Sequence, residues 1–180
     1  METRDLILDK ARFEDWENLY RNVWSRPETA RYMLWTVTDS EEEARARMER
    51  TIAWQRDHDV WTVYQKAGRQ AIGWAGLAEL SPGIWQETSI ALGPDYVGRG
   101  YGRQLLELLM EIARERGGTE FRCSTRSENR ASQALIRSCG FTLVASGPCI
   151  DQRDGSPYVL EVYARELRPR AAGLPRSEKK

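Results

Sequence analysis

The stretch LGPDYVGRGYGRQLLELLMEIA, residues 92–113, places three glycines directly before a long segment with helical apolar spacing. Gly98, Gly100 and Gly102 are unfavourable at a helix start unless another group must come close to the backbone, the alternative being an ordinary strand-to-helix turn. Unpaired amides at a helix start, together with the positive end of the helix dipole, favour a phosphate group. We therefore predict that the backbone amides of residues 98–102 bind a pyrophosphate.

Two common phosphate-binding patterns do not fit this stretch. A P-loop ends in Gly-Lys-Ser/Thr, and residues 92–113 contain no lysine. A dinucleotide fingerprint, Gly-x-Gly-x-x-Gly, would need its third glycine at Arg103 or Leu105. It also belongs in a βαβ unit, whereas turn residues at 67–69 and 81–83 indicate antiparallel strands before the loop. A nicotinamide-dependent reductase is therefore disfavoured.

The hydrophobic periodicity predicts a mixed α/β (α+β) domain around one central sheet. The length of 180 residues favours a single domain over residues 1–168, followed by a basic, frayed tail over 169–180. A possible capping box, Ser40 with Glu43, opens one of the helices. Strands are expected at 4–10, 60–66, 70–80, 84–92, 119–125, 141–146 and 158–166, and helices at 13–24, 27–35, 38–56, 101–116 and 128–139.

Composition disfavours several functional classes. Lys plus Arg equals Asp plus Glu at 27 each, so no global field recruits nucleic acid or an anionic membrane. Charges interrupt every apolar run before it could span a bilayer, so we expect a cytoplasmic protein. Three cysteines at unsuitable spacing and a single histidine, His58, predict no metal site and make Ser–His or Cys–His nucleophile schemes hard to build.

The glycine stretch resembles the acyl-CoA loop of the GNAT superfamily of N-acetyltransferases, Arg/Gln-x-x-Gly-x-Gly/Ala before a long helix. Val97 to Gly102 match it, although Val97 replaces the usual Arg or Gln. Residues 127–141, SENRASQALIRSCGF, resemble the Asn-x-x-Ser…Gly-Phe segment of the ribosomal-protein-alanine acetyltransferase branch, as does RPETARYMLW at 26–35, which lines the acceptor cleft in that branch. The resemblance covers residues 3–167.

This resemblance implies a strongly twisted, largely antiparallel sheet, splayed in its middle and flanked by helices on both faces. It also implies acetyl-CoA as the co-substrate, with Asn129 and Ser132 facing the pantetheine arm. The positions that it assigns to acetyl-CoA are Ile90, Ala91, Leu92, Val97, Gly98, Arg99, Gly100, Tyr101, Gly102, Arg103, Asn129 and Ser132.

The implied reaction is direct attack of a neutral amine on the thioester. A backbone amide within 90–92 would hold the oxyanion, and Glu87 is the candidate base, with Glu79 as the fallback. Glu87 could equally be an ordinary exposed strand residue. Many relatives protonate the thiolate with a tyrosine, but Ile136 stands at that position, which leaves Ser132 as a candidate donor or a mere hydrogen-bond partner.

The acceptor is expected to be a weakly basic primary amine, on a peptide N-terminus or a small molecule. An α-amine of pKa about 7.7–8.0 is roughly 10–15% neutral at pH 7, whereas a lysine of pKa about 10.4 is about 0.04% neutral. Trp24 and Trp35 could line its pocket or belong to the core. The alternative function is a catalytically impaired CoA-binding sensor or interaction module. In either case a monomer or homodimer is expected.

Overall fold

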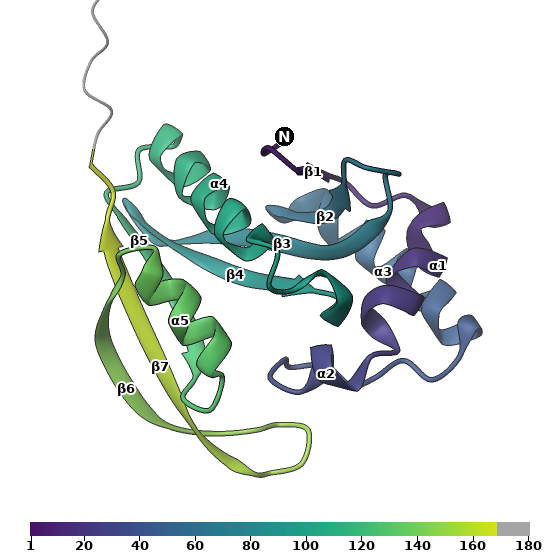
Figure 1. The fold of residues 1–180 in the computed structure, drawn as a ribbon. Coiled ribbons are helices and arrows are strands. Elements are labelled where there is room, and N and C mark those ends of the chain that lie inside the picture. Colours follow the sequence, from purple (N-terminus) through teal and green to yellow (C-terminus); the bar gives the residue numbers. More distant parts are fainter. Residues whose placement is uncertain (169–180) are drawn as a thin grey trace, which may run out of the picture.

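Seven strands form one mixed sheet in the computed structural model, which describes residues 1–168 (Figure 1). The strands are β1 (Leu6–Asp9), β2 (Val60–Gln65), β3 (Ala71–Ser81), β4 (Ile84–Leu92), β5 (Glu120–Arg126), β6 (Thr142–Ile150) and β7 (Pro157–Glu166). Their order is β1-β2-β3-β4-β5-β7-β6, and every neighbouring pair is antiparallel except β4 and β5. The predicted fold class and the antiparallel meander at 60–92 are confirmed.

The helical segments follow the predicted periodicity, with differences at their ends. They are η1 (Phe13–Asp15), α1 (Trp16–Leu19), η2 (Tyr20–Trp24), α2 (Pro27–Ala30), α3 (Glu41–Asp57), η3 (Pro94–Tyr96), α4 (Tyr101–Glu115) and α5 (Arg130–Ser138). The segment predicted as one helix over 13–24 winds successively as 3₁₀, α and π turns. Ser40 Oγ accepts from the Glu43 amide at 3.1 Å, which confirms the cap of α3.

The second predicted helix was wrong at its C-terminal end: α2 stops at Ala30 and not near Trp35. A distant side chain explains the difference. The Arg153 guanidinium donates hydrogen bonds to the carbonyls of Ala30 (2.9 Å) and Trp35 (3.3 Å), so these carbonyls are satisfied without a continuing helix. β6 also runs past its predicted end at residue 146, because as an edge strand beside β7 it tolerates Pro148.

Two separate cores lie on the two faces of the sheet. On one face, α4 and α5 pack over side chains such as Leu105, Leu109 and Phe121, all fully buried. On the other face, α1, η2 and α3 pack against β2 and β3 around Val23 and Met48. Figure 1 shows α4 and α5 together on one side of the strands and α1 and α3 grouped over the β1–β3 end. The helices therefore flank both faces, as predicted.

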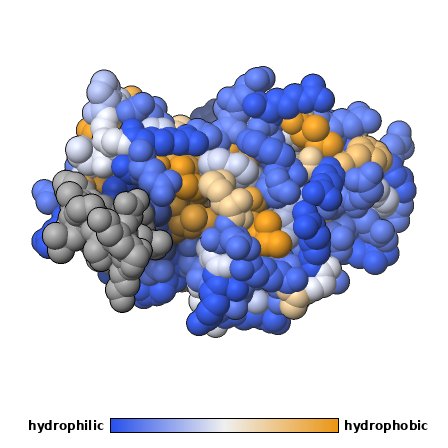
Figure 2. Space-filling model, turned by 90° about the horizontal axis from the view of Figure 1, so that it is seen from above, coloured by the Kyte–Doolittle hydropathy of each residue, from blue (hydrophilic) through white to orange (hydrophobic). Residues whose placement is uncertain are grey.

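One face of the molecule is mostly polar. Figure 2 shows a largely hydrophilic face with small hydrophobic patches. Within residues 1–168, no helix combines the length and apolar character that crossing a bilayer requires. The predicted basic tail, 169–180, lies outside the described residues.

Candidate active site

Strands β4 and β5 part in the middle of the sheet. They pair only at three positions, Ile84 with Glu120, Trp85 with Phe121 and Gln86 with Arg122. Beyond that point β4 continues alongside β3, whereas β5 continues alongside β7. A β-bulge at Thr88 adds one residue to β4 at the start of the divergence, and bulges bend strands. The sheet is therefore split between β4 and β5, as Figure 1 shows.

The split leaves one edge of β4 without a neighbouring strand. The Gly93 amide donates to the Ile72 carbonyl of β3 at 2.9 Å. Because amides along a strand point alternately to its two sides, the amides of Leu92 and Ile90 point to the open edge, and that of Ala91 points to β3. Ile90 and Leu92 are thus the two positions in the predicted range whose amides could hold an oxyanion in the split.

Glu87 lies at the point where the strands separate. It follows Gln86, the last residue of β4 that pairs with β5, and its carboxylate accepts a hydrogen bond from the Ser124 amide of β5 at 3.3 Å. Burial raises the pKa of Glu87 to about 8, against the opposing effect of this hydrogen bond. Burial raises the pKa of the neighbouring Cys123 thiol, and the negative charge of Glu87 is the next largest cause of that rise. Glu87 is thus a half-buried carboxyl that changes charge near neutral pH.

Glu79, the fallback base, is in a different environment. It is exposed, and its carboxylate accepts a hydrogen bond from the Gly83 amide at 2.9 Å. This contact closes the turn between β3 and β4. The geometry therefore favours Glu87 over Glu79 as the carboxyl at the split.

The glycine loop connects η3 to α4 and presents its backbone outward. Gly98 and Gly100 have φ of +75° and +78°, a region that side chains disfavour. Gly102 serves a different purpose, because a Cβ there would lie 2.9 Å from Leu135 Cδ2 of α5. Within residues 1–168, no atom accepts a hydrogen bond from the amides of residues 98–103. These amides form a row of free donors at the start of a fifteen-residue helix.

The side chains of the loop contribute little to that row of donors. Tyr101 is buried, and its hydroxyl accepts from Gln65 Nε2 at 3.1 Å. Arg103 reaches across to α5 and donates to Ser138 O at 3.1 Å and Ser138 Oγ at 2.9 Å. Arg99 is exposed and lies over the Tyr96 ring at 5.6 Å, and Val97 is also exposed. Backbone atoms, and not side chains, dominate this surface.

The second predicted segment forms the start of α5. Asn129 is its N-cap, and Asn129 Oδ1 accepts from the Ser132 amide at 3.1 Å. Ser132 itself is half-buried. Ile136 is 4% exposed and packs in the core under α4. The side-chain oxygen of Asn129 is thus used by the cap, and its side-chain NH2 group is the part that could contact a ligand.

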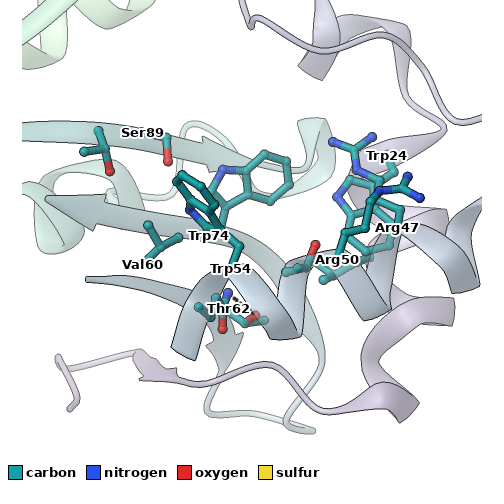
Figure 3. Close-up of a pocket in the computed structure, with 12 residues that line it drawn as sticks. Trp24, Arg47, Arg50, Trp54, Val60, Thr62, Trp74 and Ser89 are labelled. Carbon is teal, nitrogen blue, oxygen red and sulfur yellow. Dashed lines mark hydrogen bonds between the residues drawn. The ribbon is translucent and has the colours of Figure 1, made fainter. Parts of the chain in front are cut away.

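A cavity of about 450 Å³ lies on the opposite face of the sheet from α4 (Figure 3). It lies between α3 and the β2–β4 strands and reaches the bulge of β4 through Thr88 and Ser89. Its walls are Leu19, Trp24, Arg47, Arg50, Thr51, Trp54, Gln55, Val60, Thr62, Trp74, Thr88 and Ser89. Trp24, expected either in the pocket or in the core, is 1% exposed, belongs to the core and also borders the cavity. The other wall residues come from five separate elements without a local motif, so no sequence pattern indicated them.

Trp35, the other residue expected either in the pocket or in the core, does not border the cavity and packs against Trp74, which does. Its ring packs against Trp74 with centroids 5.6 Å apart, and the Arg47 guanidinium lies 4.4 Å from its centroid. Arg153, which fixes the Trp35 carbonyl, is held in turn by Asp151 at 2.7 Å. The β6–β7 turn is therefore joined to the segment that supports the cavity.

Known proteins resemble this chain in sequence and in fold. An acetyltransferase (GNAT) domain family matches residues 5–142. N-alpha-acetyltransferase RimI of Mycobacterium tuberculosis is 35% identical over 102 residues, 55% of this chain and 61% of RimI. L-amino acid N-acyltransferase MnaT of Escherichia coli is 36% identical over 69 residues, 38% of this chain and 40% of MnaT. The chain thus matches about three fifths or less of the length of these two curated relatives.

One solved structure shows how far the likeness in fold extends. The microcin C7 self-immunity acetyltransferase MccE, in complex with acetyl-CoA and AMP, superposes with a TM-score of 0.77. The superposition covers 92% of this chain and 94% of MccE at 16% sequence identity. At that identity the comparison concerns the fold alone.

Proposed function

Because this chain belongs to the GNAT acetyltransferase family, whose domain it matches over residues 5–142, we propose that it is an acetyl-CoA-dependent N-acetyltransferase. Its substrate is a primary amine on a peptide N-terminus or a small molecule. The observation that carries the proposal is the row of free amides over 98–103 at the start of α4. Relatives in this family include the N-alpha-acetyltransferase RimI and the acetyl-CoA-bound MccE.

In the proposed reaction, the amides of 98–102 hold the pyrophosphate of acetyl-CoA and the thioester lies in the split. Charged hydrogen bonds of this kind are each worth about 1.5–3 kcal/mol. The neutral amine nitrogen attacks the thioester carbonyl carbon, and the oxyanion accepts hydrogen bonds from the amides of Ile90 or Leu92. The C–S bond then breaks, which gives the amide product and a thiolate. The thiolate takes up a proton to become the CoA thiol.

Glu87 accepts the proton that the amine must lose, directly or through a water molecule. A base is most effective when its pKa lies near the working pH, and burial places that of Glu87 at about 8. An α-amine of pKa about 7.7–8.0 is partly neutral at pH 7, whereas a lysine of pKa about 10.4 is almost entirely charged. A reaction that needs a neutral amine therefore favours a weakly basic acceptor over a lysine side chain.

Calorimetric titration with acetyl-CoA tests the donor site. Gly100→Val is expected to weaken binding about 100-fold or more. The valine side chain would keep the pyrophosphate from reaching several of the backbone amides, and each such charged hydrogen bond is strong. Gly117→Val is the matched control, because Gly117 at the far end of α4 has φ of +84° and, like Gly100, open space around its Cβ position. It should bind acetyl-CoA like the unmodified protein. Equal losses in both variants, or no binding below about millimolar in the unmodified protein, would contradict the proposal.

The second candidate is a CoA-binding sensor or interaction module without catalysis. It is favoured by Ile136, which is buried in the core at the position where many relatives have a tyrosine that protonates the thiolate. Release of free thiol from acetyl-CoA over a panel of amines discriminates the two functions. Binding without thiol release for any amine would support the sensor.

A further inference from the structure

The walls of the 450 Å³ cavity change in character from one end to the other. Figure 3 shows Ser89 and Val60 at one end, Trp74 and Trp54 in the middle, and Trp24 with Arg47 and Arg50 at the far end. The Ser89 end is next to Thr88 and Glu87, where the sheet splits. A molecule that reaches the split through this cavity would therefore place its reacting end at Ser89 and its other end near the arginines.

The two arginines at the far end form no ion pair with a carboxylate of the described residues. Within residues 1–168, neither Arg47 nor Arg50 has a carboxylate within 4.0 Å, and none of the described residues that line the cavity is acidic. Arg47 lies between the rings of Trp24 and Trp35, with its guanidinium 4.9 and 4.4 Å from their centroids, and donates to Thr38 Oγ1 at 2.9 Å. Glu43 attracts the charge of Arg47, but its carboxylate accepts a hydrogen bond from the Asp39 amide at 3.2 Å.

This environment penalises positive charge, and an anion would relieve the penalty. Burial, opposed by the attraction of Glu43 and assisted by the like charge of Arg50, lowers the pKa of Arg47 to about 10. A guanidinium group is planar and presents its N–H donors in a fixed fork that matches the two oxygens of a carboxylate. The neighbouring guanidinium groups of Arg47 and Arg50 therefore suit a carboxylate or another oxyanion. The cavity therefore offers a place for a negative charge away from the split.

The middle of the cavity suits a flat ring. The indoles of Trp54 and Trp74 border it. One face of the Trp54 ring stacks on His58 with the centroids 3.4 Å apart, and because Trp54 is 57% exposed, the rest of its ring is accessible from solvent. Aromatic rings stack favourably on one another in offset or edge-to-face arrangements, so these indoles suit a flat ring. A volume of about 450 Å³ is within the range of small-molecule sites.

We infer that this cavity binds a small-molecule amine in which a flat aromatic ring separates the acetyl-accepting nitrogen from an anionic group. The nitrogen lies at the Ser89 end, the ring lies between the indoles of Trp54 and Trp74, and the anion lies against Arg47 and Arg50. This inference rests on the proposed function, and it adds a substrate class to it. An α-amino acid carries both groups on one carbon and does not meet this arrangement.

Binding of matched ligand pairs to the CoA-saturated protein tests the inference. The pairs are 4-(aminomethyl)benzoate with 4-(aminomethyl)benzamide, and 4-(2-aminoethyl)benzoate with its benzamide. At least one acid is expected to bind about 10-fold or more tightly than its neutral partner, which is the effect of one charged hydrogen bond. Equal affinities within both pairs, or no binding of either acid at millimolar concentration, would overturn the inference.

Two variants then locate the anion site. Arg47→Gln should bring the acid-to-amide preference close to 1. Arg50→Gln should reduce it about threefold, since Arg50 is exposed and makes no ion pair within the described residues. Arg50→Gln keeps the test decisive even where Arg47→Gln lowers stability. Arg45→Gln is the control, because Arg45 is on the same helix but lies over Trp16 at 4.1 Å and pairs with Glu41. A preference unchanged in both Arg47→Gln and Arg50→Gln would also overturn the inference.

Thiol release from acetyl-CoA with the same ligands separates this inference from the proposed function. An acid preference in binding without any thiol release would leave the anion site standing and remove the proposed catalysis. Thiol release with other amines, but no acid preference, would leave the catalysis standing and remove the anion site.

Discussion

The two sides of the split are built in different ways. On the α4 side, the candidate donor site consists of consecutive backbone amides over residues 98–103, and the side chains there are turned elsewhere or exposed. On the α3 side, the cavity consists of side chains drawn from five parts of the chain, from Leu19 to Ser89. The first surface depends on backbone conformation, and the second depends on which side chains the fold brings together.

This difference predicts how each side responds to mutation. Only a proline would remove a backbone N–H donor, so the donor site should tolerate most other substitutions that keep the loop conformation. The cavity should change its preference with single substitutions, because each wall residue contributes its own chemistry. Three further predictions test this contrast, in order of decreasing effect.

The largest effect is expected at Glu87, which lies between the two sides. Glu87→Gln should lower kcat about 100-fold or more, the typical contribution of a general base, and leave acetyl-CoA affinity unchanged. Glutamine keeps the shape of the side chain and an oxygen that can accept from the Ser124 amide. Steady-state kinetics and calorimetry on the same preparation measure both quantities. A parallel loss of acetyl-CoA affinity would indicate a structural role.

The pH dependence of the unmodified protein, compared with that of Glu87→Gln, sharpens this assignment. The ionised form of Glu87 increases as pH rises through about 8, so kcat/KM should rise with pH up to that value and level off. The folded protein holds this proton more tightly than an unfolded chain, where a glutamate has a pKa of about 4.3. Stability relative to Glu87→Gln should therefore fall as pH rises between those two values. If kcat/KM did not rise with pH up to about 8, Glu87 would be excluded as the base.

The next effect is expected at Asp151, on the cavity side alone. Its carboxylate accepts from Arg126 at 2.6 Å and Arg153 at 2.7 Å, and the Arg153 hydrogen bonds hold the pKa of Asp151 well below its usual range. Asp151→Asn should loosen Arg153 from the Trp35 carbonyl, raise the acceptor KM about 10-fold and lower the melting temperature by about 4 °C or more. Acetyl-CoA affinity should stay constant.

Asp154→Asn is the control for this prediction. Asp154 is exposed in the same turn and binds the Ser156 amide at 2.9 Å. Its replacement should leave the acceptor KM unchanged. Because the pKa of Asp151 is lowered by folding, its contribution is complete above the unfolded value of about 3.9 and is lost as pH falls below it. Experiments at neutral pH therefore measure the full effect.

The smallest effect is expected at Arg99, the exposed side chain of the glycine loop. Arg99→Ala should weaken acetyl-CoA binding by less than about fivefold, since an exposed ion pair is worth about 0–1 kcal/mol. The loss should shrink further at high salt, because salt screens exposed charges. Calorimetric titration at two ionic strengths measures it. A loss as large as that expected for Gly100→Val would mean that side chains, and not amides, hold the donor.

Several sequence expectations could be made because they depend on neighbours along the chain. The strands, the cap of α3 by Ser40 and the helix after the glycines follow from local periodicity and capping. The end of α2 could not be foreseen, since Arg153 satisfies its carbonyls from more than a hundred residues away. For the same reason the sequence left Glu87 as either a base or an ordinary strand residue.

The sequence by itself determined the order of elements, the antiparallel meander and the glycine loop, because backbone conformation depends on residues a few positions apart. Only the tertiary structure decided that Glu87 meets Ser124 where β4 and β5 separate. It also decided that Arg47 and Arg50 share a cavity with three tryptophans and no acid in the described part of the chain. Charge and burial at these positions arise from packing between distant segments, which no local pattern records.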